Sequence, residues 1–460
     1  MPTPPYRIME ILDKAEEGPI MLERQFDRKL AIKAKELAKQ YGITYDPDNV
    51  IPSDETLIKD LWKAGYELFL EIGVLVIDTS RVIKFTEEEI KESIKNHYET
   101  LVVGAGREAF EVYSRRIEDK RRPFIVFSPS LPYTEELFLA VEMAYAMEPL
   151  ANGVGAPVMD EILGRPVKSK GPTDVGAAMA HAMKIREAVR RVGRPGLYLA
   201  DVQSALSDTA QIAVSNPDWG VRYTDGRMVG TLAELKIDYG GLNRMINFHQ
   251  NGYIVMALFG PMVGGYAGKV ETTAIVAVAE HLMGHLVNQG HLHVHFPFDI
   301  REFNNTSRHL LWLTSVVHQS IALNSPFFTL ANGITAAGPC TEMVFYEAAA
   351  HGIVATVSGA HLWEIFSARN RHKDYTTPLE ARMAAEAGIS VAHAGLRRSD
   401  VNEIAKSILK KYEDKIHSAP LGKKFQECYD IHTLKPTKEH LELYKRVKKD
   451  LTDMGIPFIY

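Results

Sequence analysis

The chain has 460 residues, of which 46% are hydrophobic and 24% are charged, and its formal net charge is −5. This composition is that of an ordinary globular protein with enough apolar side chains for a large core. The mild negative charge excludes a general electrostatic attraction to nucleic acid. No apolar stretch approaches the roughly 18 residues that indicate a membrane span, so we expect none.

The sequence also indicates a cytoplasmic protein. Its two cysteines, Cys340 and Cys428, are far apart, which argues against a disulfide framework and fits a reducing compartment. The first ten residues, MPTPPYRIME, lack the basic segment and apolar run of a signal peptide.

Residues 1–118 are predicted to form a helical extension. Residues 54–74, DETLIKDLWKAGYELFLEIGV, place apolar side chains at approximately helical spacing behind a Ser-Asp cap signal. Residues 86–101, TEEEIKESIKNHYETL, begin with Thr86 and acidic first-turn residues, as the start of a helix should.

Residues 119–460 alternate short apolar runs with longer amphipathic segments. About seven strand candidates occur, from PFIVFSP (123–129) through HLHVHFPF (291–298) and FFTLANG (327–333) to IVATVSG (353–359). Regular alternation of strand and helix predicts a parallel sheet, either open and doubly wound or closed as a (β/α)8 barrel. The number of strands favours a TIM-type barrel, with one strand missed and helices at the C-terminus.

Barrel enzymes place their chemistry at the carboxyl ends of the strands. Polar residues follow three candidate strands at such ends: Asp201 and Gln203, then Asp299 and Arg301, then Asn332. We predict that these five residues bind a substrate. For Asp201 and Gln203, a plain capping or loop role is the alternative.

Two glycine-rich segments stand out. FGPMVGGYAGKVETT (259–273) joins a strand to a helix, and Gly264 and Gly265 within it would allow close approach of another molecule. It matches neither a P-loop nor a dinucleotide fingerprint, and VVGAGREAF (102–110) offers only a G-x-G core. Tight turns are the alternative reading of both segments.

Three histidines, His291, His293 and His295, occupy alternate positions and share one face if the segment is a strand. They are either metal ligands, a hydrogen-bonded or acid/base cluster lining the substrate cavity, or structural side chains. Metal-dependent barrel hydrolases use H-x-H on an early strand with later His and Asp ligands, whereas here only His361 follows. A metal-dependent hydrolase is therefore the alternative function.

Four segments, GYAGKVETTAIVAVAEH, AAGPCTEM, LAELKID and SAPLGKKFQECYDIHTLKPT, resemble the monomethylamine:corrinoid methyltransferases of methylotrophic methanogens. The resemblance covers nearly the whole chain. It implies a (β/α)8 barrel, a homo-oligomer, and transfer of a methyl group from a methylated amine to the Co(I) corrinoid of a separate small protein. The corrinoid (cobalamin) then belongs to that partner, so we expect no cofactor bound tightly by this chain.

The sequence departs from this family at one position of consequence. Aligning GRPGLYLADVQSALSDTAQI (193–212) places Thr209 where the family has pyrrolysine, whose imine is thought to bind the amine. Leu258 stands where we expect a family acidic group, Asn332 near a polar amide, and His293 at a family histidine. The resemblance and these changes favour a donor with a pre-activated methyl group, such as a quaternary ammonium compound.

The expected catalytic residues are therefore His293, Thr209, His291 and His295. A histidine would protonate the departing group, and Thr209 would hold a polar head group. For Thr209, as for Asp201 and Gln203, a plain capping or loop role is the alternative. The partner protein should dock at the strand ends near Gly264 and Gly265, where cobalt can reach the methyl group. A third, non-catalytic alternative is a scaffold that binds a corrinoid protein without turnover.

Overall fold

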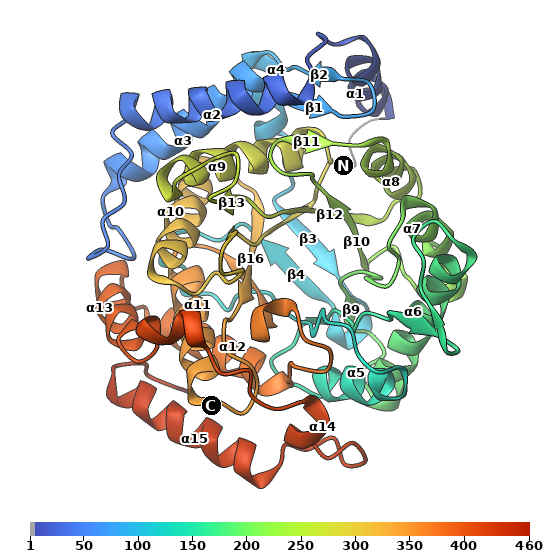
Figure 1. The fold of residues 1–460 in the computed structure, drawn as a ribbon, viewed down its shortest axis with the longest axis vertical. Coiled ribbons are helices and arrows are strands. Elements are labelled where there is room, and N and C mark those ends of the chain that lie inside the picture. Colours follow the sequence, from blue (N-terminus) through green and yellow to red (C-terminus); the bar gives the residue numbers. More distant parts are fainter. Residues whose placement is uncertain (1–4) are drawn as a thin grey trace.

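The computed structural model describes residues 5–460, apart from the side chains of Pro5, Tyr6 and Glu364, and its centre is an eight-stranded parallel barrel (Figure 1). The two strands at the ends of the hydrogen-bonded order, β9 and β10, nearly close the sheet, because the Leu199 amide donates to Asp225 Oδ1 at 3.0 Å. The predicted TIM-type barrel is confirmed. Its strands are β5 (Ile125–Phe127), β6 (Gly153–Val154), β9 (Tyr198–Leu199), β10 (Gly226–Gly230), β12 (Ile254–Phe259), β14 (Leu292–His295), β16 (Phe328–Ile334) and β17 (His361–Phe366).

Each barrel strand is followed by a helix, and these helices surround the barrel (Figure 1). They are α5 (Phe138–Ala146), α6 (Pro172–Arg191), α7 (Asp208–Val214), α8 (Tyr239–Gln250), α9 (Val270–Leu286), α10 (Arg308–Asn324), α11 (Glu342–Val357) and α12 (Pro378–Ala394). Helices α9 and α11 are buried almost all round, because further helices cover their outer faces. Such helices are apolar on every side rather than amphipathic.

Three elements differ from the prediction. Two barrel strands are missed: β10, whose sequence GRMVG has a glycine at each end and the charged Arg227 inside, and β17, whose sequence HLWEIF was not among the strand candidates. The candidate strand at residues 353–359 is instead mostly the end of α11, which runs to Val357. Its β-branched residues continue an alanine-rich helix, and packing against α12 outweighs their strand propensity.

The N-terminal extension consists of α1 (Pro5–Glu17), α2 (Glu23–Gln40), α3 (Glu55–Ile72) and α4 (Glu87–Lys95), with β1 (Val74–Val76) and β2 (Arg81–Ile83). Asp54 caps α3 by accepting from the Thr56 amide at 2.8 Å, as its sequence predicts. Helix α3 packs on α9 and α10, and β1 pairs with β11 (Lys236–Ile237) of the barrel. The extension therefore shares one hydrophobic core with the barrel helices.

A hairpin of β3 (Thr100–Val103) and β4 (Phe110–Tyr113) packs against the barrel interior. Val103 and Val112 belong to the same cluster as Tyr198 and Met256, so the hairpin covers the amino-terminal end of the barrel. The G-x-G segment is the turn of this hairpin and includes the 3-10 turn η1 (Gly106–Glu108). With that end covered, the carboxyl ends of the strands are the place for a ligand.

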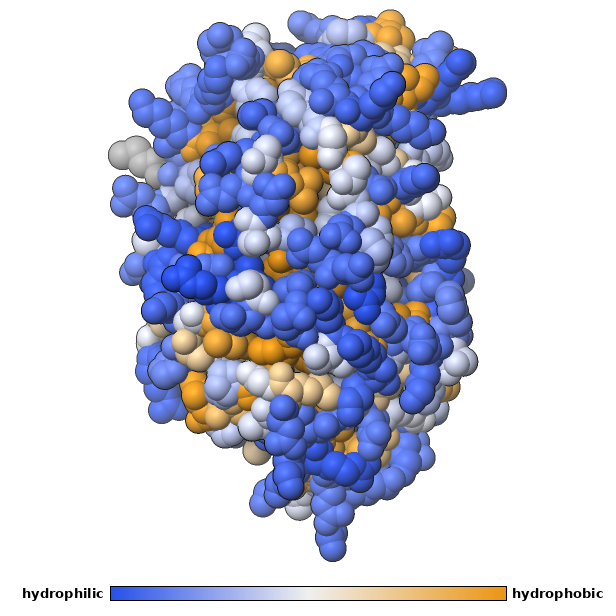
Figure 2. All heavy atoms as spheres, turned by 90° about the vertical axis from the view of Figure 1, so that its left-hand side faces the viewer, coloured by the Kyte–Doolittle hydropathy of each residue, from blue (hydrophilic) through white to orange (hydrophobic). Residues whose placement is uncertain are grey.

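The C-terminal helices are α13 (Arg398–Leu409), α14 (Phe425–Cys428) and α15 (Lys438–Asp453), of which α13 and α15 pack on α11 and α15 also contacts α12. The side of the molecule formed by the extension and these helices carries mostly hydrophilic residues, with hydrophobic ones in separate patches (Figure 2). None of the helices among residues 5–460 is long and apolar enough to cross a bilayer. Smaller elements are β7 (Glu161–Ile162), β8 (Arg165–Pro166), β13 (Met262–Val263), β15 (Phe298–Asp299), η2 (Glu135–Leu137), η3 (Pro217–Trp219), η4 (Ala368–Asn370) and η5 (Glu413–Ser418).

Candidate active site

A pocket of about 360 Å³, called here the mouth pocket, lies at the carboxyl ends of the barrel strands. Every one of the eight strands, or the segment directly after it, contributes to its wall. The lining residues are Ser130, Val158, Asp201, Gln203, Ala205, Gln211, Met228, Gly230, Arg244, Leu258, Val294, Phe296, Phe303, Asn332, Ile334, Trp363, Phe366 and Asn370. This is the position at which TIM-barrel enzymes bind their substrates.

Three of the predicted substrate-binding residues, Asp201, Gln203 and Asn332, line the mouth pocket. Within the described residues, Gln203 Oε1 and Asn332 Oδ1 are buried acceptors without a hydrogen-bond partner, and the indole N–H of Trp363 is a buried donor without one. Buried polar atoms are almost always paired in folded proteins. These atoms are therefore available to a bound molecule.

The Asp201 carboxylate forms a buried ion pair with Arg227, at 3.2 Å between Oδ1 and Nη1. Two further hydrogen bonds hold the Arg227 guanidinium in place. Its Nη2 donates to the Gln211 carbonyl at 2.8 Å, and its Nε donates to Ser215 Oγ at 2.9 Å. Burial raises the pKa of Asp201, although the charge of Arg227 opposes this rise. Because Arg227 belongs to β10, the sequence prediction missed it together with its strand.

Aromatic and apolar side chains complete the wall of the mouth pocket: Met228, Leu258, Phe296, Phe303, Trp363 and Phe366. Arg244, on α8, adds a positive charge at the pocket. The faces of aromatic rings attract a cationic group such as a methylated ammonium. The side-chain amides of Gln203 and Asn332 can orient a polar head group through hydrogen bonds. The pocket thus combines an apolar wall with a few hydrogen-bonding groups, as small-molecule sites usually do.

The histidines of β14 lie outside the barrel, not in its interior, so their predicted position in the cavity is wrong. Leu292 and Val294 point into the barrel core, and His293 and His295 point toward α9 and α10. His293 Nδ1 and His281 Nδ1 share a hydrogen bond of 3.2 Å. A barrel strand is buried on both faces, so alternation cannot tell which face looks inward.

His291, which directly precedes β14, does not line the mouth pocket either. His291 accepts a hydrogen bond from the Val255 amide at 3.0 Å, and its ring stacks against those of Tyr98 and His249. Burial lowers the pKa of His291 to about 3, and it lowers the pKa of His293 and His295 far below the usual value. Among residues 5–460, no three of these histidines bring donor atoms to metal-binding spacing.

Thr209 lies at the second position of α7 and is exposed. It is not among the residues that line the mouth pocket. Its helix begins at Ser207, whose hydroxyl accepts from the Ala210 amide at 3.2 Å. The structure therefore places Thr209 on the first turn of a helix at the surface and does not include it in the pocket wall, so its predicted role in holding a head group has no support there.

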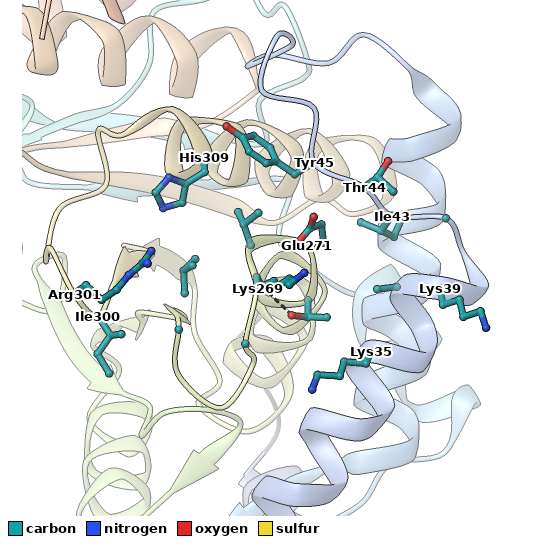
Figure 3. Close-up of a pocket in the computed structure, with 17 residues that line it drawn as sticks. Lys35, Lys39, Ile43, Thr44, Tyr45, Lys269, Glu271, Ile300, Arg301 and His309 are labelled. Carbon is teal, nitrogen blue, oxygen red and sulfur yellow. Dashed lines mark hydrogen bonds between the residues drawn. The ribbon is translucent and has the colours of Figure 1, made fainter. Parts of the chain in front are cut away.

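A second, larger hollow of about 1260 Å³, called here the extension cleft, separates α2 from the loops that follow β13 and β15 (Figure 3). Gly264 and Arg301 line it, and Asp299 lies beside it, bonded to Arg301 at 2.5 Å. Burial alone would raise the pKa of Asp299, but the hydrogen bonds from Arg301 outweigh burial and lower it. These two predicted substrate-binding residues thus lie at the extension cleft rather than the mouth pocket.

The fold and the mouth pocket define a TIM-barrel enzyme that handles a small molecule at the carboxyl ends of its strands. Comparison with known proteins specifies the family. The family profile described as "Monomethylamine methyltransferase MtmB" matches residues 6–456. The chain belongs to this family, and it is a methyltransferase.

Individual relatives match over the same extent. The chain is 34% identical over 452 residues to monomethylamine methyltransferase MtmB1 of Methanosarcina barkeri and 34% identical over 455 residues to MtmB1 of Methanosarcina acetivorans, covering 98% of each chain. Among solved structures, a crystal structure of the Methanosarcina barkeri MtmB and one of the hydroxylamine MtmB complex each superpose with a TM-score of 0.94. Both are 35% identical, with 98% of each chain covered.

Proposed function

We propose that this methyltransferase transfers a methyl group from a small methylated compound to the Co(I) corrinoid of a separate protein. The observation that supports the proposal is the composition of the mouth pocket. Side chains of Gln203, Asn332 and Trp363 each have a polar atom without a hydrogen-bond partner in the described residues, and aromatic side chains line the same pocket. In this proposal the corrinoid is supplied by the partner and is not held by this chain.

We further propose a quaternary ammonium compound or a similar pre-activated methyl donor. A neutral amine is a poor leaving group, whereas a quaternary amine leaves readily when Co(I) attacks its methyl carbon; the carbon–nitrogen electron pair then stays with the departing amine. Thr209, which the sequence aligned with the imine-bearing residue of the family, is exposed and does not line the mouth pocket, so the proposed donor class rests on the residues that do line it. The rings of Phe296, Phe303 and Trp363 favour binding of a cation. The side-chain amides of Gln203 and Asn332 orient the bound molecule.

The proposed docking site of the corrinoid protein is the extension cleft. Four basic side chains, those of Lys35, Lys39, Lys269 and Arg301, line this hollow beside the strand ends and would steer an acidic partner (Figure 3). Gly264, near which the sequence predicted docking, also lines it. Gly265 does not line it and instead lies against Met262.

Replacing the two glycines would not probe docking cleanly. Gly264 has a φ of +87°, and a Cβ there would come within 2.8 Å of Ile300 Cγ2. A Cβ on Gly265 would lie 2.9 Å from Met262 Cβ. Bulky replacements would therefore disturb the loop itself, so charge reversal on α2 is the better test.

The two alternative functions lose their support. The metal-dependent hydrolase relied on His291, His293 and His295, which do not line the mouth pocket and do not bring three donor atoms to metal-binding spacing. The non-catalytic scaffold does not agree with membership of a methyltransferase family.

The test is a corrinoid-methylation assay with purified partner protein, following the spectral change from Co(I) to methyl-Co(III). Methylated amines of increasing substitution, a sulfonium compound and a methyl ether are supplied one at a time. Quaternary ammonium or sulfonium donors should react, and monomethylamine should react slowly. Rapid turnover of monomethylamine, with threonine at residue 209 verified by mass spectrometry, would contradict the proposed donor class.

A further inference from the structure

Two segments that carry the family resemblance, AAGPCTEM and SAPLGKKFQECYDIHTLKPT, meet in space and bring both cysteines together. Cys340 precedes α11, Cys428 ends α14, and His440 lies in the first turn of α15. The two sulfur atoms and one ring nitrogen of His440 all lie within 4.8 Å of one another. Among the residues that the structure describes, this is the one group of three such side chains at metal-binding spacing.

The backbone holds the two cysteine segments against each other. The Gly338 amide donates to the Pro420 carbonyl at 3.0 Å, and the Lys423 amide donates to the Pro339 carbonyl at 3.0 Å. A Cβ on Gly338 would lie 1.8 Å from the Leu421 carbonyl oxygen, so only glycine permits this approach. The positions of the thiols therefore follow from main-chain packing.

His440 is oriented with one nitrogen unused. The Thr377 hydroxyl donates its only proton to Glu380 Oε2 at 2.6 Å, so in the 3.0 Å contact between Thr377 Oγ1 and His440 Nε2 the imidazole is the donor. The proton thus resides on Nε2, and Nδ1 keeps a free lone pair. Nδ1 is buried without a hydrogen-bond partner in the described part of the chain.

This arrangement is that of a metal-binding histidine, one nitrogen of which bonds the metal while the other donates to a neighbouring group. The His440 ring also stacks on Phe345, with 5.6 Å between the ring centroids, which restricts its rotation.

We propose that Cys340, Cys428 and His440 bind a zinc ion, with water completing the coordination. Zn–S bonds of about 2.3 Å and Zn–N bonds of about 2.0 Å separate tetrahedral ligands by roughly 3.3–3.8 Å. In the structure the three ligand atoms already lie within 4.8 Å of one another. Binding releases the two thiol protons to solvent, and two thiolates with a neutral imidazole balance the charge of the dication.

The proposed zinc site is structural. It joins α14 and α15 to the start of α11, and the Thr377 that orients His440 caps α12. None of its three ligands lines the mouth pocket. Cys340 is half-buried, which gives solvent and the ion a path to the site.

Metal analysis of the purified full-length chain tests the proposal. We expect about one zinc per chain, and at least tenfold less in each of Cys340→Ser, Cys428→Ser and His440→Gln. His432→Gln is the matched control, because this histidine lies in the same C-terminal segment but is exposed. Full zinc content in the ligand variants, or equal loss in the control, would overturn the proposal.

A second measurement uses the unaltered chain and does not depend on whether variants fold. The metal is removed with a chelator under reducing conditions, and Co²⁺ is added stepwise. We expect saturation at one ion per chain with the near-ultraviolet thiolate-to-cobalt absorption. Failure to bind Co²⁺, or binding without that absorption, would refute the site, as would a Cys340–Cys428 disulfide that takes up no zinc after reduction.

Discussion

At the scale of single residues, the mouth pocket contains amide oxygens that have no hydrogen-bond partner in the described part of the chain. Asn332 Oδ1 has no partner among the described residues, while its Nδ2 donates to the Trp363 carbonyl at 3.2 Å. We expect Asn332→Ala to lower kcat/KM for methyl transfer about tenfold, because one substrate hydrogen bond is lost. Steady-state kinetics with the preferred donor provides the measurement.

Thr209→Ala is the matched control for that substitution. Thr209 is exposed and outside the pocket lining, so its loss should change kcat/KM less than twofold. A large loss in Thr209→Ala, with little effect of Asn332→Ala, would mean that the substrate binds elsewhere.

The Asp201–Arg227 pair gives a second prediction at this scale. Arg227→Met leaves the buried Asp201 carboxylate without its counter-charge, which should destabilise the protein by about 3–5 kcal/mol. Adding Asp201→Asn should restore part of that loss, because a neutral amide tolerates burial better. Urea unfolding of the two single variants and the double variant forms a mutant cycle, and strictly additive losses would show that the pair does not interact.

At the scale of elements, Lys35 and Lys39 of α2 both line the extension cleft, and Lys35 points toward the facing loop of Lys269 (Figure 3). We expect the double reversal Lys35→Glu and Lys39→Glu to weaken binding of the corrinoid protein at least tenfold, mainly through slower association. Arg28→Glu is the control, because this residue is exposed on the same helix but does not line the cleft. Equal weakening by both changes would point to general charge rather than docking at this site.

The same scale shows what the sequence could predict. Strand ends identified Asp201, Gln203 and Asn332, because that rule depends only on chain order in a parallel barrel. It missed Arg227, whose strand β10 lacks an apolar run, and Arg244, which reaches the mouth pocket from α8. The inward or outward direction of a strand buried on both faces also depends on register, which single-sequence patterns do not contain.

At the scale of the whole molecule, the alternation of strand and helix segments along the sequence was enough to predict the barrel. It could not predict that Cys340, Cys428 and His440 lie close together. The three residues span about a hundred positions, and the loops between them set their approach. Only the folded structure shows that the two segments containing the cysteines contribute side chains to the same site. Long-range convergence of this kind leaves no periodic signal in the sequence.

The histidines around β14 should make the whole molecule sensitive to acid. His295 is fully buried, neither ring nitrogen has a hydrogen-bond partner among the described residues, and burial lowers its pKa far below the unfolded value of 6.5. As pH falls below 6.5, the unfolded chain binds a proton that the folded chain does not, so the free energy of unfolding decreases. Each such histidine contributes up to about 1.4 kcal/mol per pH unit.

Buried carboxyl groups act in the opposite direction, so the test must compare variants. Burial raises the pKa of Glu347 to about 7, which stabilises the folded state below the unfolded value of 4.5 and loses that stabilisation as pH rises toward 7. This contribution is common to the unaltered protein and to His295→Leu, and it cancels in their difference. Between pH 6.5 and 4.5, the free energy of unfolding of His295→Leu should therefore fall less steeply, by up to about 1.4 kcal/mol per pH unit. Urea unfolding at several pH values measures both slopes, and parallel slopes would show that His295 accepts a proton in the folded barrel.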